Sequence, residues 1–121
     1  MIKKILIADN EVKLLGAYSV LLCRYGFKVY TAGNNDAFEK IFIRETPDLL
    51  IMDIVFGESS GPETYDRIMK SSAAPKTPVI FVSELVDRRS ESPLVRGRQV
   101  AMYAKPLNIE LPLGITFNEL L

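Results

Sequence analysis

The sequence predicts an α/β domain in which helices cover both faces of a parallel sheet. Short apolar runs, typical of strands buried on both faces, recur along the chain, and segments with apolar residues at helical spacing separate them. Parallel neighbours need crossover helices, so this alternation favours a doubly wound, five-stranded sheet. The 121 residues are 48% hydrophobic and no repeat or linker divides them, so we expect residues 1–121 to form a single domain.

The expected strands are short apolar runs that end beside polar residues. They cover residues 5–8, 27–32, 49–52, 79–82 and 100–104. Each run is too short for a stable helix, and most are nearly continuous in hydrophobicity. For residues 5–8 this continuous hydrophobicity predicts a strand buried on both faces.

The expected helices lie between these strands. The first is indicated by apolar residues at helical spacing that end before Gly26, namely Leu14, Leu15, Tyr18, Leu21, Leu22 and Tyr25. A second helix covers residues 35–45, and a third follows a loop at residues 57–62, where Ser60 and Glu63 have the spacing of a capping box.

The last two helices have weaker patterns. Pro93 and Gly97 interrupt residues 84–99, which predicts a weak or partly irregular fourth helix. The fifth lies between residues 108 and 121, with Pro112 near its start.

Composition excludes several classes of function. The 15 basic and 15 acidic residues cancel, which disfavours direct nucleic-acid binding. The absence of histidine excludes imidazole-based catalytic dyads and histidine-rich metal sites. The single cysteine, Cys23, is expected to be a small buried hydrophobe, which fits a reducing cytoplasm, and the apolar stretch before Asp9 is too short for a membrane span.

Four polar residues follow the ends of four predicted strands: Asp9, Asp53, Ser83 and Lys105. In an open parallel sheet the carboxyl ends of the strands meet in one crevice, where ligands collect. Carboxylates, a hydroxyl and an ammonium group at one place indicate phosphate chemistry. Each residue alone is equally consistent with a turn, a helix cap or a solvated loop, but the coincidence of four favours a functional site.

With these residues in place, the chain resembles the receiver domain of two-component response regulators over nearly its whole length. The matching features are an acidic cluster after the first strand, the phosphoacceptor, a loop glycine, a hydroxyl residue and a Lys-Pro pair, which correspond to Asp9, Asn10, Glu11, Asp53, Gly61, Ser83, Lys105 and Pro106. The resemblance implies a flavodoxin-like (CheY-like) strand order of 2-1-3-4-5.

The resemblance also implies a role for each site residue. Asp53 would accept a phosphoryl group from a sensor histidine kinase or phosphotransfer protein, with Ser83 and Lys105 contacting the transferred oxygens. Mg²⁺ would be held by Asp9, Asn10, Asp53 and the backbone carbonyl of Val55. Phosphorylation would change contacts with a downstream protein, and homodimerisation follows by analogy.

Three positions depart from the family pattern. Asn10 replaces a usual aspartate and removes a negative charge, which predicts weak Mg²⁺ binding. Glu84 follows Ser83 where a small residue is usual, and Met102 replaces a usual aromatic residue. These departures leave open a pseudo-receiver that acts as a phosphorylation-independent interaction module.

An enzymatic alternative is a phosphatase-like hydrolase with Asp53 as nucleophile. Hydrolysis needs a positioned water or base, and the neighbouring Val55 and Leu85 are apolar. The sequence therefore favours a non-enzymatic module in which Asp53 undergoes self-phosphorylation and self-dephosphorylation alone.

Overall fold

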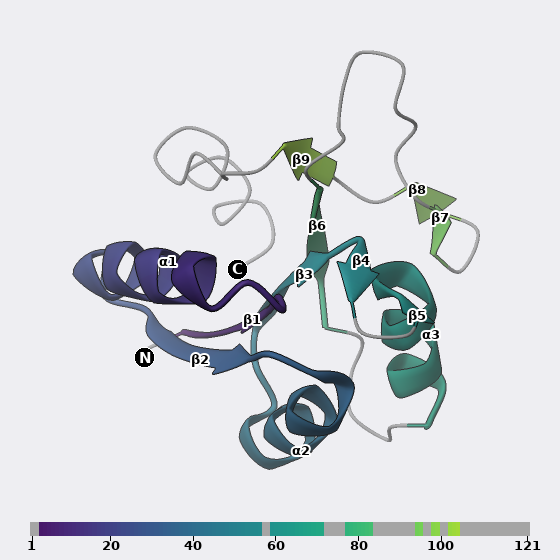
Figure 1. Ribbon diagram of the computed structural model, residues 1–121. Coiled ribbons are helices and arrows are strands. Elements are labelled where there is room, and N and C mark those ends of the chain that lie inside the picture. The colour runs from purple at the N-terminus through teal and green to yellow at the C-terminus, as the bar shows by residue number, and fades with distance from the viewer. Residues whose placement is uncertain are drawn as a thin grey trace.

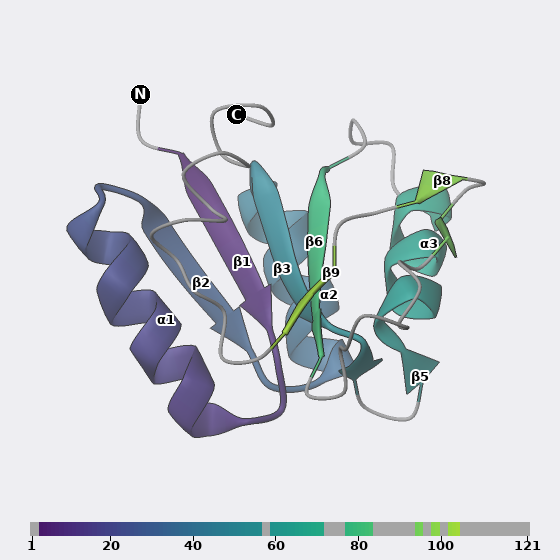
Figure 2. The ribbon, with the colours of Figure 1, turned by 90° about the horizontal axis from the view of Figure 1, so that it is seen from above.

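The protein folds around a five-stranded parallel sheet, seen in a computed structural model that describes residues 3–56, 59–71, 77–83, 94–95, 98–99 and 102–104. The strands are β1 (Lys4–Ala8), β2 (Lys28–Ala32), β3 (Leu49–Asp53), β6 (Val79–Ser83) and β9 (Met102–Ala104). Their order across the sheet is β2-β1-β3-β6-β9, which confirms the predicted fold class and strand order (Figures 1 and 2).

Helices cover the two faces of this sheet (Figure 1). Helix α1 (Val12–Arg24) lies on one face, and α2 (Asn35–Glu45) and α3 (Gly61–Ser71) lie on the other. In the described residues, no helix is both long enough and apolar enough to cross a membrane.

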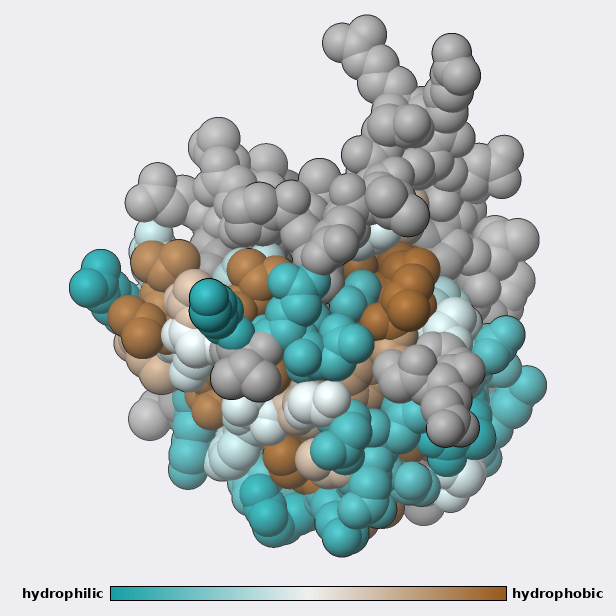
Figure 3. All heavy atoms as spheres, viewed as in Figure 1, coloured by the Kyte–Doolittle hydropathy of each residue, from teal (hydrophilic) through white to brown (hydrophobic). Residues whose placement is uncertain are grey.

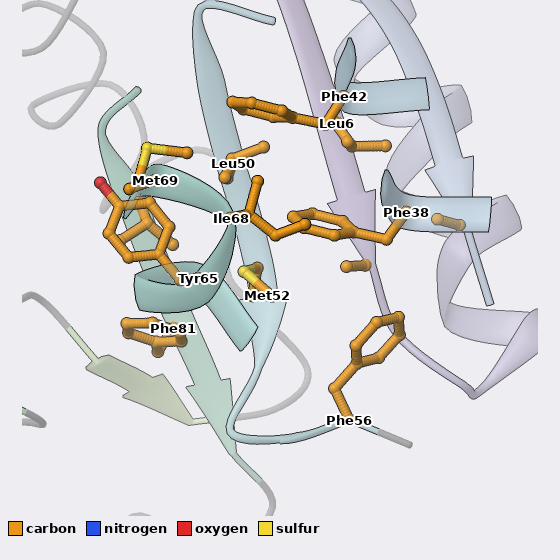
Figure 4. Packing of buried hydrophobic residues seen from close by; sticks show 13 residues of the cluster. Leu6, Phe38, Phe42, Leu50, Met52, Phe56, Tyr65, Ile68, Met69 and Phe81 are labelled. Atoms are coloured by element: carbon orange, nitrogen blue, oxygen red, sulfur yellow. The ribbon is translucent and has the colours of Figure 1, made fainter. Parts of the chain in front are cut away.

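Alternation along the strands divides the core into two clusters, because successive side chains point to opposite faces. Leu6, Leu50 and Phe81 belong to the cluster beneath α2 and α3, which Figure 4 shows. The residues next to them, including Ile7 and Ile51, belong to the cluster beneath α1. The central strands are thus buried on both faces, as their continuous hydrophobicity predicts.

Helix α1 buries a narrower stripe than its sequence suggests. Leu15, Tyr18 and Leu22 pack against the sheet, whereas 40% of Leu21 and 56% of Tyr25 are exposed. The same holds for the single cysteine: Cys23 is exposed, so its predicted burial is wrong. A helix turns by about 100° per residue, which carries the residue after Leu22 away from the sheet. Apolar side chains are accordingly visible over α1 at the surface (Figure 3).

Local sequence signals lie at the boundaries of the three helices, one after the end of α1 and two at the starts of α2 and α3. Gly26 adopts a φ of 88°, a left-handed conformation that suits glycine, just after α1. The Asn34 side chain caps α2 by accepting a hydrogen bond from the Ala37 N–H at 2.8 Å. The Ser60 hydroxyl oxygen accepts one from the Glu63 N–H at 3.1 Å, which is the serine half of the predicted capping box.

Two segments differ from the sequence-based expectation. Part of the loop predicted at residues 57–62 is regular structure: β5 (Ser59–Ser60) pairs antiparallel with β4 (Val55–Phe56), and α3 already begins at Gly61. Where a weak fourth helix was expected, β7 (Leu94–Val95) pairs antiparallel with β8 (Arg98–Gln99). Pro93 and Gly97 both oppose helix formation, which agrees with the absence of a helix in the described part of this segment. The rest of that segment, and the helix expected at residues 108–121, lie outside the described residues.

Candidate phosphoacceptor site at the carboxyl edge of the sheet

Two buried aspartates lie at the ends of neighbouring strands at the carboxyl edge of the sheet. Strand β1 pairs with β3 as far as Ala8, which lies opposite Met52. Asp9 and Asp53 are the next residues of these neighbouring strands, and such strands are spaced about 4.8 Å apart. Asp9 is fully buried, and Asp53 is 7% exposed. The sequence places polar residues here, and the parallel register brings the two acidic ones together.

Each carboxylate accepts a hydrogen bond from its own loop. Asp9 Oδ1 accepts one from the Glu11 N–H at 2.9 Å, and Asp53 Oδ1 accepts one from the Val55 N–H at 3.2 Å. Both are bonds to the backbone two residues on, the geometry of an Asx turn. Such turns orient the two carboxylates.

Ser83 ends the next strand of the same edge. Asp53 pairs with Val82, and the Ile54 N–H donates to the Val82 carbonyl at 2.9 Å. Ser83 therefore follows directly at the level of Ile54, partly buried and opposite Ala104 of β9. Lys105 and Glu84 come next in the chain but lie outside the described residues.

The donor set at this edge suits a hard divalent cation. Asp9 and Asp53 offer carboxylate oxygens and Val55 a backbone carbonyl, the oxygen ligands that Mg²⁺ takes alongside retained waters. Asn10 is exposed and adds no charge. Within the described part of the chain, no cluster of three or more Asp, Glu, His or Cys could hold a metal ion, so the carboxylate complement here is small. The residues present fit Mg²⁺, with few charged ligands.

Beside Asp53, the structure adds a contact that sequence reasoning did not identify. The Gly61 N–H, at the start of α3, donates to the Ile54 carbonyl at 2.6 Å. Gly61 corresponds to the family's loop glycine, and its spacing from Asp53 is the signal that the sequence offers. Its contact with the main chain at Ile54, directly after β3, depends on how the β4–β5 ladder returns the chain.

Comparison with known proteins identifies the family. The family model for the response regulator receiver domain matches residues 5–110, so the chain belongs to this family. Among curated relatives, the Haemophilus influenzae homolog of the transcriptional regulatory protein CpxR is 33% identical over 86 residues, covering 70% of this chain and 37% of that protein. The chain matches between 14% and 37% of the length of its curated relatives, so it spans well under half of each.

Solved structures give the same answer. A response regulator receiver domain protein from Clostridium thermocellum is 26% identical, with a TM-score of 0.80 over 98% of this chain and 93% of that chain. The response regulator TrrA from Thermotoga maritima, solved in complex with Mg²⁺-BeF, is 26% identical, with a TM-score of 0.79 over 99% of this chain and 100% of that chain.

Membership of this family gives the general activity. Receiver domains of two-component systems are signalling modules rather than general enzymes, and they interact with histidine kinases or phosphotransfer proteins. Asp phosphorylation and Mg²⁺ use are general features of the family, and the TrrA complex is an example of a relative solved with Mg²⁺.

Proposed function

We propose that this domain accepts a phosphoryl group on Asp53 from a histidine kinase or phosphotransfer protein and thereby changes its contacts with a downstream protein. The observation that carries the proposal is the placement of Asp53 at the carboxyl end of β3, beside buried Asp9 and one strand from Ser83.

The proposed chemistry is an in-line displacement at phosphorus. A carboxylate oxygen of Asp53 forms the new bond to phosphorus while the bond to the donor breaks and its electron pair leaves with the donor, giving an acyl phosphate. The Ser83 hydroxyl would donate a hydrogen bond to a transferred oxygen, and Lys105 would contribute positive charge. Mg²⁺, bound weakly by Asp9, Asn10, Asp53 and the Val55 carbonyl, would neutralise charge on the transferred oxygens.

The remaining assignments follow from this role. We propose residues 1–121 as one receiver unit, without enzymatic activity beyond the self-phosphorylation and self-dephosphorylation of Asp53 and without direct nucleic-acid binding. Its single cysteine and absence of internal disulfides favour a cytoplasmic setting. Homodimerisation remains a proposal by analogy with the family.

The test is the mass of the intact protein after incubation with a small-molecule phosphodonor and Mg²⁺. One phosphoryl adduct is expected in the parent and none in Asp53→Asn. A matched control is Asp36→Asn, which replaces an exposed aspartate that pairs with Lys40 on α2 and should retain the adduct. Because self-dephosphorylation of Asp53 also releases phosphate, the distinguishing result is the adduct itself: an adduct lost as fast as it forms would instead indicate a hydrolase.

A second candidate function is a pseudo-receiver that signals through fixed protein contacts. The uncharged Asn10, exposed beside the two buried aspartates, favours it. An adduct absent from the parent but present in Asn10→Asp would establish this function, because it would show an intact site that lacks one ligand charge.

A further inference from the structure

We propose that Gly61 is a positioning residue for Asp53, because its missing side chain lets the first residue of α3 rest against the main-chain carbonyl of the acceptor. The inference rests on the proposed acceptor role of Asp53. It assigns a purpose to the β4–β5 ladder, which returns the chain from Asp53 to α3.

Space, rather than backbone conformation, is what requires glycine here. A Cβ atom at Gly61 would overlap the carbonyl oxygen of Asp53, and would lie 3.1 Å from its carbonyl carbon and 3.2 Å from Cε1 of Phe81. Within the described residues, Gly26 is the one glycine with a positive φ, so an alanine at position 61 meets a packing conflict without backbone strain.

The neighbours of Gly61 are held in place. Phe81 is fully buried and packs edge-on to the ring of Tyr65, with 6.4 Å between centroids. The Tyr65 hydroxyl donates to the Thr77 carbonyl at 2.5 Å, which ties α3 to the segment just before β6. Figure 4 shows Tyr65 and Phe81 together beneath α3. With α3 held in place, a side chain at Gly61 would therefore push against the main chain of Asp53 and against the fixed Phe81 ring.

The segment that follows Asp53 is anchored at its far end as well. Phe56 is fully buried and meets Phe38 of α2 edge-on, with 6.1 Å between ring centroids (Figure 4). With α3 and Phe56 both fixed, the strain of a new Cβ falls on the main chain at Asp53. Misplacing a reacting group by about 1 Å costs on the order of 100-fold in rate.

The experiment compares Gly61→Ala with Gly33→Ala. Gly33 lies at the same edge, between β2 and α2, and a Cβ there would sit 3.9 Å from the Asp9 carbonyl oxygen, an ordinary contact. The rate of phosphorylation by a small-molecule phosphodonor with Mg²⁺ should fall on the order of 100-fold in Gly61→Ala. It should stay near the parental value in Gly33→Ala.

A second readout reports position without any phosphorylation. The amide NMR signals of Asp53, Ile54 and Val55, recorded without phosphodonor, should shift in Gly61→Ala and stay in place in Gly33→Ala. Unshifted signals with a parental rate in Gly61→Ala would overturn the inference. If the parent itself takes no phosphoryl group, the proposed acceptor role fails, and these amide shifts still decide whether Gly61 positions Asp53.

A capping pair covers the case in which Gly61→Ala does not fold. Ser60→Ala removes the cap that holds the first turn of α3, and Asn34→Ala removes the equivalent cap of α2, another helix of 11 residues. A positioning role predicts shifted Asp53 signals and a slower reaction in Ser60→Ala alone. Equal slowing in both variants, with Asp53 signals unmoved, would reduce Gly61 to a structural role and reject the proposal.

Discussion

At the residue scale, the proposed Mg²⁺ site has one negative charge fewer than the family pattern, because Asn10 stands in place of an aspartate. Replacing Asn10 by aspartate adds a carboxylate next to buried Asp9, so Mg²⁺ affinity should rise roughly tenfold, since affinity in such sites follows ligand charge. Titration calorimetry with Mg²⁺ measures the change. Asn10→Ala is the comparison: it removes the side-chain oxygen of a proposed ligand and should weaken Mg²⁺ binding below the parental affinity. Equal affinities of parent and Asn10→Asp would show that position 10 lies outside the metal shell.

Another single residue, Glu45, links stability to pH at the opposite edge of the sheet. Hydrogen bonds from Arg44 Nε at 2.8 Å and from the Tyr30 hydroxyl at 2.9 Å lower the pKa of Glu45 from 4.5 to about 2. Lys4 Nζ adds a longer contact at 3.5 Å. The ionised carboxylate is favoured in the folded state, so its stabilisation is present above pH 4.5 and disappears as the pH falls towards about 2.

Glu45→Gln should remove this dependence. The urea midpoint of the variant should lie below that of the parent at neutral pH, and the gap should close between pH 4.5 and about 2. Asp36→Asn, which breaks an exposed pair with Lys40 at 3.0 Å, is the control and should show a smaller gap. A gap for Glu45→Gln that stays constant with pH would contradict the linkage.

Residue-level prediction from sequence succeeds where topology alone determines position. Asp9, Asp53 and Ser83 end successive strands of a parallel sheet, so the strand pattern suffices to bring them to one edge. The contact between Gly61 and the Asp53 carbonyl depends instead on the return of the chain through β4 and β5. The spacing in the sequence singles out Gly61, but it does not show that the Asp53 carbonyl lies in the space that a side chain at position 61 would occupy.

At the element scale, α1 carries an interior glycine without need of one. A Cβ at Gly16 would meet nothing within 4 Å, in contrast to the conflict at Gly61. Gly16→Ala should therefore stabilise the protein by about 0.5–1 kcal/mol, because alanine loses less backbone entropy in a helix. Urea unfolding measures the shift. A lower midpoint would mean that this face of α1 packs against something in the folded protein.

The two residues of β4 should contribute very differently to the stability of the protein. Phe56 is fully buried, whereas its neighbour Val55 is 65% exposed. Phe56→Ala should cost about 3–5 kcal/mol of unfolding free energy, the usual range for losing a buried aromatic ring, whereas a surface change such as Val55→Ala should stay within about 0.5 kcal/mol. Both values come from urea unfolding. Similar costs for the two variants would show that the side chain of Phe56 does not anchor the acceptor loop.

Elements differ in how well the sequence specifies them. Helix α2 begins and ends at the predicted residues because an Asn34 cap and a clear apolar face agree. The segment with Pro93 and Gly97 has neither signal, and its described part forms β7 and β8 instead. In α1, apolar residues continue beyond the buried stripe, so periodicity identified the helix but overestimated its buried face, including Cys23.

At the scale of the whole molecule, the two core clusters share the same strands. Ile51 faces the cluster beneath α1, and the adjacent Met52 faces the cluster beneath α2 and α3. Each of these strands packs against helices on both faces. If the helix on one face unfolded, the strands would expose that face to water, and the sheet on which the other helices pack would be destabilised as well. The two faces should therefore unfold together, as small single domains usually do.

Ile51→Val tests this coupling from one face. The variant loses a methylene group in the α1 cluster and should lower the unfolding free energy by about 0.5–1.5 kcal/mol. NMR signals of Tyr18, under α1, and Tyr65, under α3, should both shift to the same lower urea midpoint, because both tyrosines report one transition. Ile43→Val, at a side chain 66% exposed on α2, should leave both midpoints unchanged. A shift confined to Tyr18 would show that the α1 face unfolds separately. The order of the acceptor edge, where Asp9 and Asp53 lie at the ends of strands shared by both clusters, would then not require both clusters to be packed.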